Sequence, residues 1–238
     1  MIGIDWTYFL YVGPFMLLSL WASWKVKSSF RKWDQEPNAS GISGAQVARM
    51  ILDRSGLQNV KVERVEGQLT DHYDPSAKTL RLSDATYDST SVAAAGVAAH
   101  EAGHAIQDKV KYPMLAFRTA IVGIAGFGSN MSMIIITIGM IMMSFLGSKL
   151  GFYIAAVGVA LFSIVVIFQL ITVPVELDAS NRAKELLQNM AITRTGSGTG
   201  VNEVLNAAAW TYVAAAATGI ATLLYYVVRL AGFRSSDD

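Results

Sequence analysis

Residues 89–109 read STSVAAAGVAAHEAGHAIQDK, and this stretch decides the fold. It begins with serine and threonine, which favour the N-cap of a helix, and continues with a run of alanines, so it predicts a helix. The motif H-E-x-x-H occupies residues 100–104 within it. Residues four apart lie on one helix face, so both imidazoles can reach one metal ion. Glu101 lies close enough to act on a water molecule at that metal.

The few histidines of the chain strengthen this interpretation. Only three are present, and the motif uses two of them, His100 and His104, while the third is His72. The chain has no cysteine, which excludes disulfides, thiolate metal sites and a cysteine nucleophile. The alternative is a pair of core histidines beside a surface glutamate. It is disfavoured because burying unpaired polar groups on a small-residue helix face is costly.

A catalytic zinc site needs a third protein ligand and an open position. In metzincins the third ligand is a histidine six residues after the second, but that position is Val110, which excludes the class. Residues 109–175 contain no Asp, Glu or His, so the first candidate is Glu176. A charge marking the membrane surface is the alternative for Glu176. Asp178 is the competing ligand and is expected to orient an imidazole instead. A further ligand, His72, would close the site and suit structural zinc.

Composition indicates a membrane protein. Hydrophobic residues make up 53% of the chain and charged residues 16%, against about 25% charged in soluble domains. The net charge of +1 provides no field that would recruit nucleic acid, so no nucleic-acid partner is expected. Charge is nearly missing from four segments, each long enough to cross a bilayer of about 30 Å. These predicted spans are residues 6–24, 119–147, 151–173 and 204–228.

The distribution of basic residues predicts the topology. Asp5 precedes the first span and Lys25 and Lys27 follow it, the reverse of a removable signal peptide, so a retained anchor with an outer N-terminus is expected. The positive-inside rule then places the residues after this span in the cytoplasm. Only Lys149 lies in the short loop between the second and third spans. Both regions that carry candidate ligands are therefore expected on the cytoplasmic side.

This topology predicts five parts with different roles. They are a membrane anchor at 1–24, a cytoplasmic unit at 25–112 that carries the motif helix, a membrane hairpin at 113–173, a cytoplasmic segment at 174–203 with the third ligand, and a fourth span with its tail at 204–238. The first 14 residues of the cytoplasmic unit, 25–38, are expected as a basic connector, and residues 193–200 as a flexible loop.

The cytoplasmic unit is predicted to be a small α+β fold. A helix is expected at 43–55, because apolar residues recur at helical spacing and a glycine follows. Strands are expected at 60–65 and 79–82, with a turn at Asp74-Pro75 between them. The strand at 79–83 is expected at the edge of the sheet, where an extended peptide substrate would pair with it. An ordinary edge strand is the alternative.

The blocks SGAQVAR, GQLTDHYDP, LRLS, AAHEAGHAIQD and PVELDAS together resemble the YugP-type bacterial membrane zinc metallopeptidases. This resemblance covers most of the chain. A more distant one is to HtpX-like membrane proteases, which have an aspartate four residues after the later glutamate, where this chain has Ser180. The resemblance implies a zincin-like unit joined to about four transmembrane helices. It also implies a Zn²⁺-dependent endopeptidase of the bacterial cell membrane but no natural substrate. A peptide or a membrane protein is the expected partner of such an enzyme.

The expected mechanism follows from the candidate site. Zinc would activate a water molecule and polarise the scissile carbonyl, and Glu101 would act as general base and then as general acid. His72 and Tyr73 are the candidate donors for the oxyanion. The alternative for this pair is a turn held by local hydrogen bonds from Asp71 and Asp74.

Two other functions compete with proteolysis. A non-catalytic metal-binding membrane scaffold is the main alternative, and the retained Glu101 argues against it. A transporter is disfavoured because four spans with hardly a charge inside them make a poor pathway.

Overall fold

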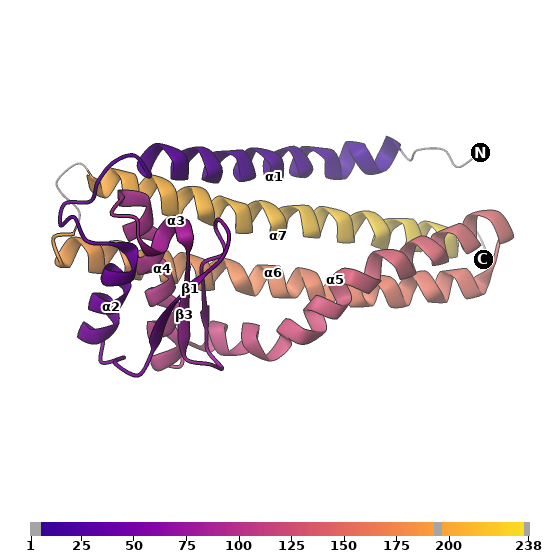
Figure 1. The fold of residues 1–238 in the computed structure, drawn as a ribbon. Helices are drawn as coiled ribbons and strands as arrows, with labels where there is room; N and C mark the ends of the chain where they lie inside the picture. The colour runs from indigo at the N-terminus through magenta and orange to yellow at the C-terminus, as the bar shows by residue number, and fades with distance from the viewer. Residues whose placement is uncertain (1–5, 193–196, 236–238) are drawn as a thin grey trace. The chain divides into compact units, whose positions relative to one another are not determined.

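The computed structural model describes residues 6–192 and 197–235. They divide into two compact units. The helical unit consists of Met1–Trp21, Phe117–Val173 and Tyr212–Asp238, and the α+β unit of Ala22–Ala116 and Pro174–Thr211. Four long helices each contribute residues to both units: α1 (Trp6–Trp33), α5 (Pro113–Leu146), α6 (Lys149–Asn189) and α7 (Ser197–Ser235) (Figure 1).

The same four helices are long and apolar enough to cross a membrane, as the sequence predicts. Many of their large apolar side chains are exposed, among them Phe127, Ile134 and Leu170. Such a surface is costly in water and suits contact with lipid. The expected assignment of chain segments to membrane and cytoplasm stays a prediction.

Small residues let α5 and α6 pack closely as a hairpin. The turn contains Gly147 at a φ of +53°, a left-handed conformation that glycine adopts without strain. Gly139 lies against the backbone of Ala155, and Gly158 lies against Ile136, with no room for a side chain at either glycine. The hairpin turns the chain back, so that residues 113–116 before it and 174–189 after it both belong to the α+β unit.

The α+β unit contains a small mixed sheet and three further helices (Figure 1). Strand order is β1-β3-β2, with β1 parallel and β2 antiparallel to β3. A capping box between Ser43 and Gln46 starts the helix predicted at 43–55. The elements are α2 (Gly44–Arg54), β1 (Lys61–Val65), β2 (His72–Asp74), β3 (Thr79–Ser83), α3 (Asp84–Tyr87) and α4 (Val92–Lys109).

The core of this unit lies between the sheet, α2, α4 and the later part of α6. Leu80 and Leu82 of β3 are fully buried against the apolar faces of α2 and α4. The alanines of α4 are buried as well, and Ala183 and Leu187 of α6 belong to the same cluster. Small side chains on α4 therefore allow other elements to approach the helix that carries the H-E-x-x-H motif.

Polar contacts from the connector fix the start of α4. Ser91 is the N-cap: its hydroxyl accepts from the Ala94 amide at 3.0 Å and donates to Asp34 at 3.0 Å. The buried Asn38 donates to the Thr90 carbonyl at 2.7 Å. These contacts give α4 a defined starting point.

The structure corrects four expectations. β3 is the central strand of the sheet, so the expectation that residues 79–83 form an edge is wrong. β2, where only a turn was expected, is an edge strand. Much of the expected connector at 25–38 is helical, because α1 continues to Trp33. In the expected loop at 193–200, residues 193–196 lie outside the described residues, whereas 197–200 begin α7.

Candidate metal centre

Three potential metal ligands meet inside the α+β unit. His100 and His104 come from α4 and Glu176 from α6. A Glu176 carboxylate oxygen lies 3.1 Å from His100 Nε2 and 3.4 Å from His104 Nε2. The candidate ligand atoms of the three residues all lie within 4.8 Å of one another. Glu176 is 3% exposed, so the carboxylate faces the imidazoles and not solvent.

Gly103, inside the motif, permits this meeting of two helices. A Cβ atom at this position would lie 2.8 Å from the carbonyl oxygen of Ala179 on α6, closer than real Cβ atoms approach. Glycine therefore lets the two backbones approach where any side chain would separate them. Glu176 and Ser180 lie on either side of Ala179 in the sequence, within reach of the histidines.

Each imidazole is held at its other ring nitrogen by a neutral group. His100 Nδ1 lies 3.1 Å from the Ser180 hydroxyl, and His104 Nδ1 lies 2.9 Å from Gln107 Oε1. Ser180 stands where the HtpX-like proteases have aspartate. The H-E-x-x-H motif does not predict a role for Gln107. The one sequence feature that points to Gln107 is its position three residues after His104, on the same helix face.

These contacts determine what the cluster can bind. Gln107 Oε1 only accepts, so Nδ1 of His104 carries the hydrogen, and the Ser180 hydroxyl can accept a hydrogen from Nδ1 of His100 in the same way. With Nδ1 of both rings protonated, the Nε2 lone pairs point with the Glu176 carboxylate toward one place. Three acceptors facing each other repel unless a proton or a cation lies between them. Two imidazole nitrogens and one carboxylate are the donor set of many catalytic zinc sites. The residues present therefore fit a zinc ion.

Glu101 lies beside the first histidine and is not one of the clustered ligands. It is 8% exposed, and burial raises the pKa of its carboxyl above the ordinary value. The nearby histidines lower this pKa, whereas the negative charges of Glu176 and Asp71 raise it further. Within the part of the chain that the structure describes, Glu101 makes no hydrogen bond to another residue. Its carboxylate is available to a water molecule or a substrate.

Asp178 lies next to the cluster but outside it. Its Oδ2 atom accepts from Gln107 Nε2 at 2.8 Å and from Arg182 Nε at 2.6 Å. These two donors lower the pKa of Asp178 against the opposing effect of partial burial. The side chain that touches His104 is Gln107, so the expectation that Asp178 orients an imidazole stays a prediction.

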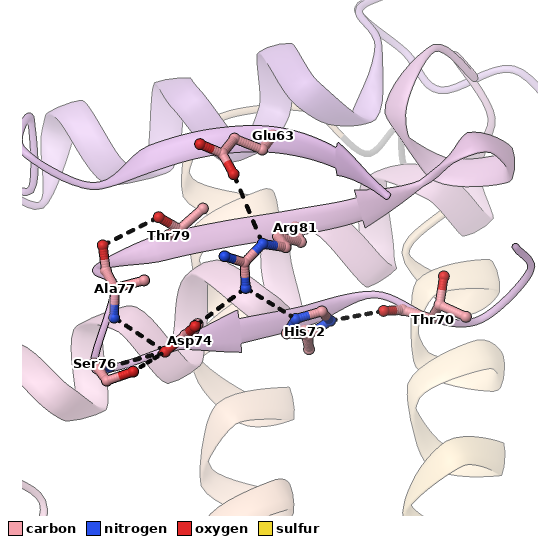
Figure 2. A network of polar contacts seen from close by, with 8 residues as sticks. All are labelled: Glu63, Thr70, His72, Asp74, Ser76, Ala77, Thr79 and Arg81. Atoms are coloured by element: carbon pink, nitrogen blue, oxygen red, sulfur yellow. Dashed lines mark hydrogen bonds and ion pairs between the residues drawn. The ribbon is translucent and has the colours of Figure 1, made fainter. Parts of the chain in front are cut away.

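His72 and Tyr73 point to opposite faces of β2. The His72 ring lies 2.8 Å from the Thr70 carbonyl and 3.4 Å from Arg81, on the outer face of the sheet (Figure 2). The Tyr73 hydroxyl instead donates to Asp108 of α4 at 2.7 Å. Successive residues of a strand alternate in direction, which explains the separation. An oxyanion role for either residue stays a prediction.

The turn after β2 has the local hydrogen bonds expected of it. Asp74 accepts from the Ser76 and Ala77 amides, both at 3.0 Å, and from Arg81 at 3.1 Å (Figure 2). Asp71 accepts from the backbone and hydroxyl of Ser83 at 2.8 and 2.9 Å. Both aspartates therefore hold the β2–β3 region together.

Comparison with known proteins agrees with this site. The model of a family described as "Putative neutral zinc metallopeptidase" matches residues 8–231. The chain is 44% identical to the "Putative membrane protease YugP" of Bacillus subtilis (strain 168) over 211 residues, which cover 89% of this chain and 91% of that protein. No solved structure matches the chain. By the extent of both sequence matches, the chain belongs to this zinc metallopeptidase family.

Proposed function

We propose that the protein is a zinc-dependent endopeptidase of the bacterial cell membrane. The observation that carries the proposal is the convergence of His100, His104 and Glu176, with the carboxylate of Glu101 unbonded beside them. Family membership supports the reaction class, and four candidate membrane-spanning helices support the location. Peptides or membrane proteins are the substrates that this class of enzyme cleaves.

Each residue of the cluster has a distinct task in this proposal. His100 and His104 would bind zinc through Nε2, and Glu176 through its carboxylate. Bound zinc supplies an acidified water molecule and a polarised scissile carbonyl. Glu101 accepts the proton of the water and passes it to the leaving amine. Ser180 keeps the His100 ring oriented by its contact with Nδ1.

The substrate backbone is proposed to pair with β2. This strand forms one edge of the sheet, and Tyr73 connects it to Asp108, one turn beyond His104 on α4. Pairing through main-chain groups gives weak sequence selectivity, so an enzyme of this kind accepts many sequences. The site is proposed to face the cytoplasm, which the basic residues at the end of α1, including Arg31 and Lys32, support.

A Glu101→Gln variant tests the function. The amide has the shape of the carboxylate but accepts no proton, so turnover of an unfolded protein substrate should fall by about 10²- to 10⁴-fold while zinc stays bound. His100→Ala should lose both zinc and activity. Glu185→Gln, at an exposed glutamate of α6, is the matched control and should leave turnover unchanged.

Two results would contradict the proposal. Near-normal turnover in Glu101→Gln would require another base. A wild-type protein that binds zinc but cleaves no peptide or membrane protein would instead be a metal-binding scaffold.

A further inference from the structure

We infer that Gln107 is a positioning residue: it fixes the tautomer of His104 and connects this ring to Asp178 by hydrogen bonds. The inference rests on the proposed zinc site. It gives a role to a buried side chain that the H-E-x-x-H motif does not include. It also explains why an acidic residue two positions after Glu176 is close to the site without touching a candidate ligand.

All polar atoms of the Gln107 amide have partners. The side chain is 0% exposed. Its Nε2 donates to the Val175 carbonyl and to Asp178 Oδ2, each at 2.8 Å, and its Oε1 lies 2.9 Å from His104 Nδ1. An amide buried without such bonds would be destabilising, so the contacts account for a polar residue in this position.

The two acceptors on α6 determine which way the amide points. A backbone carbonyl and an ionised carboxylate only accept hydrogen bonds, so the NH₂ end of Gln107 must face them. The carbonyl end therefore faces His104. Oε1 can only accept, so Nδ1 of His104 must carry the hydrogen, and the Nε2 lone pair is left to face Glu176.

The same side chain joins the two helices that carry the candidate ligands. Gln107 lies one turn after His104 on α4, and its two acceptors, Val175 and Asp178, flank Glu176 in the sequence of α6. Arg182 binds Asp178 at 2.6 Å and balances its charge. One amide thus sets both the ring orientation on α4 and the position of α6 beside it.

Gln107→Glu separates this role from packing, because the two side chains have almost the same shape. The new carboxylate would face the Val175 carbonyl and the Asp178 carboxylate, both acceptors. We expect zinc affinity, measured by chelator competition on the purified full-length protein, to fall by about 10- to 100-fold, as when outer partners of metal ligands are lost.

Adding Asp178→Asn should restore part of the affinity, because Asn offers an amide hydrogen to the new carboxylate. We expect the double variant to recover at least about tenfold. Asp178→Asn alone should change zinc affinity by less than about threefold, because its amide oxygen still accepts from Gln107. Wild-type affinity in Gln107→Glu, or no recovery in the double variant, would overturn the inference.

Gln107→Met decides the matter if Gln107→Glu fails to fold. Methionine fills the volume without an acceptor for His104, so zinc affinity should fall at least about tenfold. Unchanged affinity in this variant would also overturn the inference. A wild-type protein that binds no zinc would instead contradict the proposed function, so the two failures are distinguishable.

Discussion

Replacing Gly103 by alanine should damage the metal site through the backbone alone. The added Cβ would lie 2.8 Å from the Ala179 carbonyl oxygen and 3.3 Å from the Ala179 Cα, whereas ordinary contact begins at 3.4 Å. Both atoms belong to the backbone of α6, which cannot rotate away as a side chain can. The helices must therefore separate by about 0.6 Å at this point.

That displacement is large for a metal site. Ligand distances in zinc sites are held to within about 0.2 Å, and Glu176 lies three residues from the contact on the displaced helix. We expect zinc affinity to fall by at least about tenfold, or about 1.4 kcal/mol. Overpacking costs about 1–3 kcal/mol, whereas replacing helical glycine by alanine gains about 1 kcal/mol, so the zinc-free protein should lose at most about 2 kcal/mol.

Gly96→Ala is the matched control on the same helix. Its Cβ would lie 3.6 Å from Val201, an ordinary contact, so this variant should keep wild-type zinc affinity and gain up to about 1 kcal/mol of stability. The assays are chelator competition for zinc affinity and thermal unfolding of the detergent-solubilised protein. Wild-type zinc affinity in Gly103→Ala would refute the argument that close helix approach builds the site.

Three further predictions concern the ligands, the oxyanion and the topology. Glu176→Ala should lower zinc affinity by more than about 100-fold and Asp178→Ala by less than about tenfold; the reverse order in metal analysis would exchange their roles. If Tyr73 or His72 donates to the oxyanion, Tyr73→Phe or His72→Ala should reduce turnover by about 10²- to 10³-fold in steady-state assays, whereas a loss below about tenfold would leave that residue only its present hydrogen-bond partners. A Glu36→Cys variant of this cysteine-free chain should react with an impermeant thiol reagent only after cells are permeabilised; labelling in intact cells would place the site outside.

The parts of the site that the sequence predicts are those with local signals. The spacing of His100 and His104 places them on one helix face wherever the helix lies. Glu176 could be found by elimination, because no acid or histidine precedes it for more than 60 residues. The four apolar helices can be predicted from length and composition alone, because a helix needs about 20 consecutive apolar residues to cross a membrane.

The remaining features depend on contacts between distant segments. β2 has only three residues, and it is a strand only because it pairs with β3. β3 is central because it also pairs, in parallel, with β1. Gln107 lies three residues after His104 on α4, and Ser180 lies four residues after Glu176 on α6, so each shares a helix face with a candidate ligand. Their roles, however, depend on how closely α4 approaches α6. Gly103 sets that approach, and a glycine within a motif gives no sign of its neighbour on another helix.

We propose that His100, His104 and Glu176 hold one zinc ion. Anomalous X-ray diffraction from crystals of the wild-type protein, recorded above and below the zinc absorption edge, tests it most directly. We expect one anomalous peak about 2.0–2.1 Å from Nε2 of both histidines and about 2.0–2.2 Å from a Glu176 oxygen, with one position open to water. A peak bound by Asp178 in place of Glu176, a fourth protein ligand closing the site, or no zinc peak at these residues would contradict the account.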